Sequence, residues 1–271
     1  MVYSFQPHQG FNALHFPSLM VSGTGHGFTS RQGPGESREE AFASLNMGLR
    51  TGEDPRRIKK NHRLFLEAAG LSGYSLVTCE QVHGSRVEET GPCRDFCVVP
   101  GADALITQQE GQVLSLFSAD CALLFLVDRR ARAVGMVHAG WRGAVKGIGR
   151  KAVLKMGEGS GVSPGDLLVG ISPCIGPCCF EVREDVAGAL EEEGFPREGI
   201  LAPSLHGRGS WLMDLTALNV LQLKEAGVPG EQIFAAGICT CCRKDLFYSY
   251  RRDRGVTGRM MGYVYLDRKV R

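Results

Sequence analysis

The sequence contains a series of short apolar runs that are separated by glycine-rich turns or by helical patterns. Several of these runs do not alternate between apolar and polar residues, which is the pattern of a strand covered on both faces. With 36 glycines and 12 prolines in 271 residues, many tight turns are expected. We therefore expect a layered α/β or α+β fold and not a helical bundle. The predicted strands cover residues 75–82, 113–117, 123–127, 133–137, 167–171, 233–238 and 260–266.

Four helices are predicted, and the clearest begins after Asp54. Asp54 is a helix-capping residue, Pro55 suits the first turn, and Gly70 suits the end. No repeat and no linker divides the chain, so we expect one domain over residues 1–271. The other predicted helices cover residues 185–193, 214–227 and about 143–155.

The charge balance excludes several classes of protein. Lys and Arg number 31 and Asp and Glu number 29, which gives a net charge of +2. This balance argues against nucleic acid or an anionic membrane as the main partner. No stretch approaches the ~20 apolar residues that span a membrane, and no signal peptide is apparent at the N-terminus. We expect a cytoplasmic protein, and the sequence indicates no particular oligomeric state.

The ten cysteines are interpreted for a reducing compartment, where disulfides are rare. Most are expected to be buried thiols. Six of them form two groups with C-x₃-C and C-x-C spacings, which differ from the C-x₂-C pairs of structural zinc sites. We therefore favour neighbouring buried thiols over a second metal site for these six: Cys174, Cys178, Cys179, Cys239, Cys241 and Cys242.

Three residues with metal-binding side chains, His83, Cys121 and His138, each follow a predicted strand. Strand ends are places where a rigid scaffold presents side chains to a cleft. Two imidazoles and one thiolate suit zinc, and a site with three protein ligands keeps its fourth position for water or substrate. From the residues alone, the favoured interpretation is two hydrogen-bonded core histidines and one buried thiol, and zinc is the alternative.

Cys121 also fits a second chemistry. A thiol beside His83 or His138 could act as a nucleophile with a histidine base, and Asp120 could orient that base. This interpretation requires a lowered thiol pKa.

The segment HAGWRG, residues 138–143, joins a predicted strand to a predicted helix. A helix N-terminus favours anions, and the Arg142 guanidinium suits phosphate or carboxylate. The alternative is a tight turn in which Trp141 packs and Arg142 pairs with a carboxylate. A second segment, FYSYRRD followed by TGR with Arg259, either presents aromatic rings and cations to a polar ligand or forms a solvated charged turn.

The chain resembles the YfiH-type proteins, a family labelled both multicopper polyphenol oxidase (laccase) and peptidoglycan editing factor. The most specific segments are QVHG, SADC and HAGWRG. The resemblance extends along nearly the whole chain through FTSRQG, FASLNMGLRTGEDPRRIKKNHRLF, GADALIT, SPCIGPCCFEV, DLTALN and FYSYRRDRGVTGRMM.

The resemblance implies a single four-layer α/β/β/α domain with mixed sheets, similar to the deamidase domain of cytotoxic necrotising toxins. It implies a purine nucleoside phosphorylase, which converts adenosine, inosine, guanosine or methylthioadenosine and phosphate to the base and ribose 1-phosphate. It also implies adenosine deaminase activity. The zinc ligands of the family fall on His83, Cys121 and His138.

For phosphate we expect Arg142 and the amides after His138, with Arg31 and Arg251 as weaker candidates. Asn46, in the FASLNMGL segment, is a further substrate-binding candidate. Asp120 is expected to act as an acid/base or to support the metal ligands. The chain departs modestly from the family pattern at Ala122 and Leu123 after SADC.

Other functions remain open from the sequence. One is a cysteine-dependent hydrolase or amidase that edits peptidoglycan precursors through Cys121. Another is a copper-dependent polyphenol oxidase, although the chain has seven histidines and no His-x-His, which fits copper poorly. The third is a binding or scaffold protein without catalytic activity.

Overall fold

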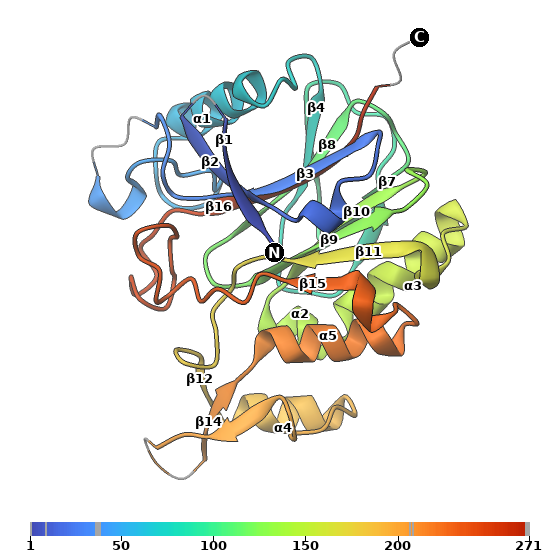
Figure 1. Cartoon of the computed structure of the whole chain (residues 1–271). Coiled ribbons are helices and arrows are strands. Elements are labelled where there is room, and N and C mark those ends of the chain that lie inside the picture. The colour runs from blue at the N-terminus through green and yellow to red at the C-terminus, as the bar shows by residue number, and fades with distance from the viewer. Residues whose placement is uncertain (1, 9, 36–38, 206, 208, 269–271) are drawn as a thin grey trace.

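Two β-sheets pack face to face at the centre of the molecule (Figure 1). The computed structural model describes residues 2–8, 10–35, 39–205, 207 and 209–268. The first sheet has seven strands, in the order β1 (Ser4–His8), β2 (Phe11–His15), β3 (Thr24–Thr29), β16 (Met260–Leu266), β8 (Gln112–Ser118), β4 (Ser75–Cys79) and β6 (Phe96–Val99). The second has six, in the order β15 (Ile233–Ala235), β11 (Leu167–Ile171), β9 (Ala122–Asp128), β10 (Val134–Ala139), β7 (Ala104–Thr107) and β5 (Val87–Glu89).

Both sheets mix parallel and antiparallel strands. In the first sheet β4 runs parallel to β6 and to β8, whereas β16 runs antiparallel to β3 and β8. In the second sheet β11 is parallel to β15 and antiparallel to β9. The expected mixed α/β fold is therefore confirmed.

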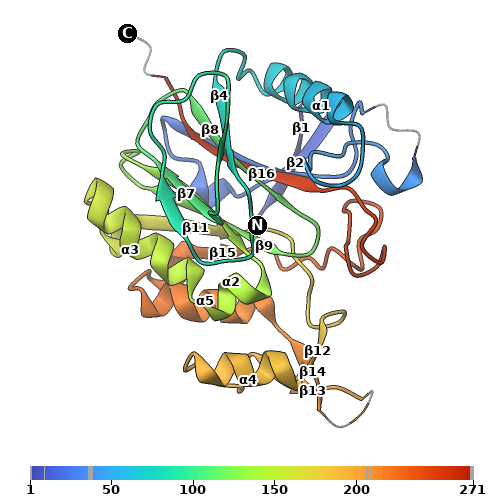
Figure 2. The same cartoon turned by 180° about the vertical axis from the view of Figure 1, so that it is seen from behind.

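Helices cover the outer faces of the two sheets, as Figures 1 and 2 show from opposite sides. Helix α1 (Pro55–Ala68) lies over the seven-stranded sheet, where Phe65 packs edge-on against Tyr263. The six-stranded sheet is covered by α2 (Trp141–Val145), α3 (Ile148–Ser160) and α5 (Leu215–Glu225). Side chains such as Phe28, Phe125 and Val264 fill the core between the sheets. The layers thus run helix, sheet, sheet, helix.

A smaller unit extends from the end of the molecule that carries α5 (Figures 1 and 2). It consists of a three-stranded antiparallel sheet and α4 (Glu184–Glu192). The strands are β12 (Glu181–Arg183), β14 (Ser210–Met213) and β13 (Leu201–Pro203). Short 3₁₀ helices occur at Pro17–Leu19, Glu40–Phe42, Pro164–Asp166 and Gly230–Gln232.

The helix ends agree with the sequence signals at α1. The Asp54 carboxylate accepts the Arg56 N–H at 2.9 Å, and Gly70 follows the helix with a φ of 71°. The helix predicted over about 143–155 is wrong as a single element. Gly147, with a φ of 72°, separates the short α2 from α3, because a left-handed residue ends the helical hydrogen-bond pattern.

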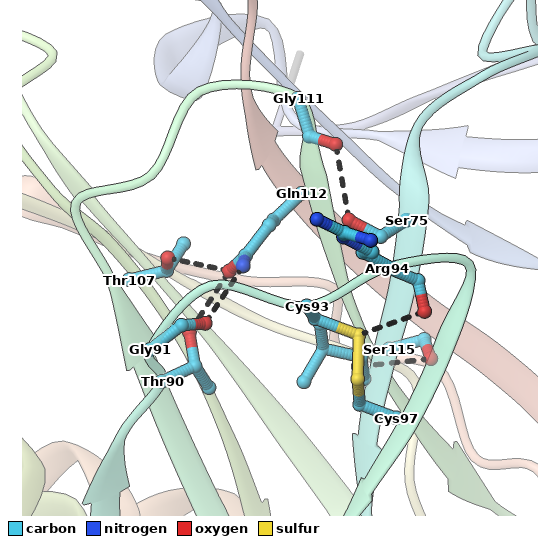
Figure 3. The surroundings of a disulfide bond; sticks show 11 residues. Ser75, Thr90, Gly91, Cys93, Arg94, Cys97, Thr107, Gly111, Gln112 and Ser115 are labelled. Atoms are coloured by element: carbon cyan, nitrogen blue, oxygen red, sulfur yellow. Dashed lines mark hydrogen bonds between the residues drawn. A yellow bond between two sulfur atoms is a disulfide. The ribbon is translucent and has the colours of Figure 1, made fainter.

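A disulfide joins Cys93, in the connection between β5 and β6, to Cys97 in β6 (Figure 3). The expectation that the chain contains only thiols or metal ligands is therefore wrong for this pair. Their Cα atoms lie 6.2 Å apart, within the range that a disulfide bridges. The same connection is held by Gln112, whose side-chain oxygen accepts the Thr90 and Thr107 hydroxyls at 3.0 and 2.9 Å.

The remaining cysteines are less buried than expected. Cys79 and Cys174 are buried, but Cys178 and Cys242 are exposed and the other four are half-buried. The prediction of mostly buried thiols is wrong because the segments after β11 and β15 run along the surface. Among the described residues, no helix is long and apolar enough to cross a membrane.

Candidate active site

The three predicted metal ligands come together where the two sheets meet. His83 lies on the loop after β4, Cys121 on the turn that joins β8 to β9, and His138 within β10. The Sγ atom of Cys121 and one ring nitrogen from each histidine all lie within 4.8 Å of one another. His138 is inside its strand and not beyond it, but its side chain still reaches the predicted partners.

Asp103, directly before β7, accepts hydrogen bonds from both histidines. Its carboxylate accepts His138 Nδ1–H at 2.9 Å, the His83 backbone N–H at 2.9 Å and the Gly84 N–H at 2.7 Å. Its backbone carbonyl accepts the His138 N–H at 2.7 Å. Because Nδ1 of His138 is occupied in this way, Nε2 is the ring atom free to bind a metal. A carboxylate behind a histidine ligand is the usual support of a metal site.

The backbone around the trio adopts uncommon conformations. Gln81, His83 and Asp120 have φ angles of 56°, 59° and 93°, which are strained for residues other than glycine. The Gln81 side chain ties this loop to β8, since it donates to the Phe117 carbonyl at 2.7 Å and accepts the Phe117 N–H at 2.9 Å. Such strain persists where the surrounding contacts hold it, and it clusters at functional sites.

Gly140 has no side chain, and its absence leaves the space in which the side chains of the trio meet. A Cβ atom at this position would lie 2.9 Å from Cys121 Sγ and 3.0 Å from His83 Nδ1. Any larger residue would therefore displace two of the three candidate ligands. Gly140, the first glycine of HAGWRG, is therefore a steric requirement of the site.

The two histidines have opposite electrostatic surroundings. Burial alone lowers the pKa of His138, but the nearby Cys121 and the Asp103 carboxylate raise it to about 9. Burial and the neighbouring His138 lower the pKa of His83, and the charges of Arg142 and Arg259 lower it further. Hydrogen bonds from His138, Gly84 and His83 outweigh burial and lower the pKa of Asp103. The site therefore presents a fixed carboxylate, a thiol and two imidazoles.

A cavity of about 550 Å³ opens beside the trio. Its lining combines the trio with four arginines and several aromatic rings, a set suited to an anion and a flat apolar group. The arginines are Arg50, Arg142, Arg251 and Arg259, and the rings are those of Phe117, Trp141, Phe180 and Tyr250.

Arg142 lies in this cavity with its guanidinium 4.4 Å from the centre of the Trp141 ring. Within the described part of the chain it forms no ion pair with a carboxylate, which disfavours the charged-turn alternative. Arg142 itself belongs to α2, which has only five residues. The group suited to an anion at this position is therefore the Arg142 guanidinium and not a helix terminus.

Two other predicted residues stabilise the cavity wall, and of the two only Asp120 is part of the lining. The Asp120 carboxylate accepts the Thr240 and Ser249 hydroxyls at 2.6 and 3.0 Å and the Arg251 N–H at 2.7 Å. The Asn46 side-chain oxygen accepts the Gly48 and Arg259 N–H groups at 2.9 and 2.8 Å. Both side chains are bonded within the protein, so their geometry suits positioning.

The remaining two candidates differ in location. Arg251 lines the cavity and donates to the Glu181 carbonyl at 3.1 Å. Arg31 lies at a separate hollow lined by Glu40 and Asp253, and it donates to the Ala43 carbonyl at 2.8 Å. The structure does not bring Arg31 to the trio.

Sequence reasoning missed Asp103 as a supporting residue and gave Arg259 no role beyond membership of a segment that could contact a polar ligand. Asp103 lies in the quoted segment GADALIT, and an acidic residue directly before an apolar run was the available signal. Arg259 stood out only as part of a basic stretch, and only the fold places it beside His83.

The comparisons with known proteins agree in fold and sequence. A family model described as multi-copper polyphenol oxidoreductase laccase matches residues 25–267. A protein from Geobacillus stearothermophilus named purine nucleoside phosphorylase YlmD is 39% identical over 245 residues, covering 88% of each chain. The crystal structure of YlmD from that organism has a TM-score of 0.89 at 36% identity, covering 98% of this chain and 99% of that one. The structure of Bacillus licheniformis hypothetical protein YfiH also has a TM-score of 0.89, at 29% identity, covering 97% and 99%.

Proposed function

Since this chain belongs to the multi-copper polyphenol oxidoreductase laccase family, which includes the YlmD and YfiH proteins, we propose that it is a zinc-dependent purine nucleoside phosphorylase. The relative from Geobacillus stearothermophilus is named purine nucleoside phosphorylase, and the zinc is part of our proposal. The observation that supports the proposal most is the cavity itself, where a His/Cys/His trio, arginines and aromatic rings line one space.

We assign the metal to His83, Cys121 and His138. Two imidazoles, one thiolate and an open fourth position suit catalytic zinc. A blue-copper site uses two histidines and a cysteine with a weak axial methionine, glutamine or backbone oxygen. None of the described cavity-lining residues is a methionine, and the amide of the lining residue Gln81 is bonded to the Phe117 backbone. When bound, the ion would supply a Lewis acid that activates water or polarises a substrate oxygen.

Phosphate would bind to the arginines of the cavity. Arg142 is exposed and free of carboxylate partners among the described residues, and Arg259 is held beside His83 by the Thr257 and Gly258 carbonyls. A phosphate oxygen attacks ribose C1′, the bond from C1′ to the purine nitrogen breaks, and its electron pair leaves with the base. Because the transition state is cationic at the ribose, a fixed anion on one face lowers the barrier.

The purine would stack on the aromatic rings. Phe180, Trp141 and Tyr250 line the same cavity, and planar bases bind well to such faces. The Asp120 and Asn46 contacts keep Arg251 and Arg259 in place. We include adenosine deamination as a second reaction of this cavity, since the open metal position suits hydrolysis at C6 of adenine.

The test is release of hypoxanthine from inosine by zinc-loaded protein, with and without phosphate. Phosphate-dependent release that a chelator abolishes is expected. Cys121→Ala should lose zinc and turnover together. Release in the absence of phosphate, or full activity in Cys121→Ala, would contradict the proposal.

Arg142→Ala should raise the KM for phosphate by about tenfold or more, because one charge-assisted hydrogen-bond partner is worth at least ~1.4 kcal/mol. Arg31→Ala is the matched control, since Arg31 lies outside the cavity. An equal effect in both variants would show that the phosphate site lies elsewhere.

A cysteine hydrolase is the second candidate function, and one observation favours it. Cys121, His138 and Asp103 have the order of a nucleophile, a base and an orienting carboxylate, as in thiol hydrolases. The orienting residue is Asp103 and not Asp120. This candidate requires activity in the presence of a chelator and covalent trapping of Cys121 by an alkylating agent, both of which the zinc enzyme lacks.

A further inference from the structure

Four cysteines lie together outside the active site. Cys178 and Cys179 belong to segment 172–180, between β11 and β12, and Cys239 and Cys242 belong to segment 236–259, between β15 and β16. Their four Sγ atoms all lie within 4.8 Å of one another. Two segments that are far apart in the sequence therefore present their sulfurs to one point.

The distances between the sulfurs match a single metal ion. Cys242 Sγ lies 3.6 Å from Cys178 Sγ and 3.5 Å from Cys179 Sγ. A tetrahedral zinc site with Zn–S bonds of about 2.3 Å places its sulfurs about 3.7 Å apart. In an iron–sulfur cluster the cysteines bind different iron atoms, so their sulfurs lie farther apart than those around one ion. The Sγ atoms here all lie within 4.8 Å of one another, which disfavours a cluster.

The surroundings of the quartet also suit thiolates. The Gly176 N–H donates to Cys239 Sγ at 3.3 Å, as amides do to metal-bound sulfur. A Cβ atom on Gly176 would lie 3.4 Å from Cys178 Sγ and 3.3 Å from Cys239 Cβ, so a glycine lets this turn approach. Cys178 and Cys242 are exposed, although cysteine is one of the most buried residue types. Four clustered and partly exposed thiols call for a ligand.

Cationic groups lie next to the quartet. Four thiolates and one divalent ion carry a net charge of −2. The Arg251 guanidinium donates to the Cys179 carbonyl at 3.5 Å, and the Arg252 guanidinium donates to the Thr240 and Cys241 carbonyls at 3.1 and 3.2 Å. The Arg252 guanidinium is also paired with Asp253 at 2.8 Å, so it is chiefly the Arg251 charge that would offset part of the charge of a zinc–thiolate centre.

We propose that Cys178, Cys179, Cys239 and Cys242 bind a second zinc ion in a closed structural site that ties segment 172–180 to segment 236–259. Both segments line the active-site cavity, the first with Ile175 and Phe180 and the second with Arg251. The present link between the backbones of the two segments is a bridge at Cys174 and Cys239. The ion therefore fixes one wall of the cavity without touching the substrate.

The experiment counts zinc in reduced, zinc-loaded protein after removal of free metal. Wild type should retain two ions per chain, Cys242→Ser one, and the matched control Cys241→Ser two. Cys121→Ser, which removes a ligand of the other site, should retain one ion. Cobalt bound to Cys121→Ser should show the visible absorption of a tetrahedral tetrathiolate site.

The two metal sites fail separately in this design. If only the active-site assignment is wrong, wild type and Cys121→Ser retain the same single ion and Cys242→Ser retains none. The second site is overturned if Cys121→Ser binds no zinc or if Cys242→Ser and wild type bind the same amount. Alkylation of wild type followed by mass spectrometry covers the case in which Cys242→Ser does not fold. Zinc should protect the four cysteines until a chelator is added, and unprotected or disulfide-bonded cysteines would overturn the proposal.

Discussion

Asp103, which the sequence analysis did not identify, positions both histidines of the site. Its carboxylate fixes the His138 ring and the backbone of His83 and Gly84 at once. Asp103→Asn should weaken zinc binding by about 10–100-fold, the usual effect of losing such a supporting carboxylate. Competition with a chromophoric chelator measures this loss.

The control for this variant is Asp120→Asn. Asp120 bonds to Thr240, Ser249 and Arg251 and not to the candidate ligands. Asp120→Asn should lower the free energy of unfolding by about 1–3 kcal/mol. It should weaken zinc binding less than Asp103→Asn does. Equal losses of zinc affinity in the two variants would refute the role given to Asp103.

Gly140 gives a second prediction at this scale. In Gly140→Ala the new methyl group must displace Cys121 Sγ or His83 Nδ1, since it would lie 2.9–3.0 Å from them. We expect loss of zinc from the active site with the fold retained, measured by metal analysis and circular dichroism. Full zinc occupancy in this variant would show that the trio tolerates a displacement that the structure forbids.

The sequence predicted the metal trio because each member interrupts or ends an apolar run, which is a local signal. The support of the trio could not be predicted in that way. Asp103 meets His138 across 35 residues and Arg259 comes to His83 from the far end of the chain, so only strand pairing brings these pairs together. Asn46 was predicted to bind substrate, but its side chain bonds to Gly48 and Arg259.

At the scale of elements, Gly147 is the point at which one predicted helix becomes two. Its φ of 72° separates α2 from α3. Gly147→Ala should lower the free energy of unfolding by about 1 kcal/mol, because only glycine adopts this conformation without strain. A Cβ atom on Gly188, inside α4, would meet no other atom within 4 Å. Because alanine has a higher helix propensity than glycine, Gly188→Ala should raise the free energy of unfolding by up to about 1 kcal/mol. Urea denaturation compares the two, and the same sign in both would contradict this explanation.

Some strands could be predicted from their own sequence, whereas others depend on contacts with distant residues. Strands β11 and β16 were predicted with their observed bounds, because both are apolar throughout. Strand β3, with the sequence TGHGFT, was missed. Its Gly25 and Gly27 lie under the rings of Tyr265 and Tyr263 from β16, and this cross-strand packing leaves no apolar pattern in β3 itself.

At the scale of the molecule, buried neutral histidines make stability depend on pH. His62 lies on the buried face of α1, stacks on Phe117 and donates from Nε2 to the Met47 carbonyl at 2.7 Å. Burial lowers the pKa of His62 from 6.5 to about 4, and burial with the neighbouring His15 lowers that of His26 to about 3. Below pH 6.5 the unfolded chain takes up protons that the folded chain excludes, so stability is full above pH 6.5 and falls toward pH 4.

His62 alone should account for a loss of about 3 kcal/mol over that range, at about 1.4 kcal/mol per pKa unit. His62→Gln should therefore flatten the pH dependence of the free energy of unfolding between pH 6.5 and 4. Lys59→Gln, at an exposed position of the same helix, should keep the wild-type slope. An unchanged slope in His62→Gln would assign the acid sensitivity to other groups.

Strand β16 lies in the interior of the seven-stranded sheet, between β3 and β8. During synthesis on the ribosome, residues 24–29 and 112–118 emerge long before residues 260–266 can fill the gap between them. The two halves of that sheet must wait with unpaired edges, where chaperones and proteases compete for them. Folding of the seven-stranded sheet should therefore be largely post-translational. Nascent chains that stop short of residue 260 should be degraded in the cell.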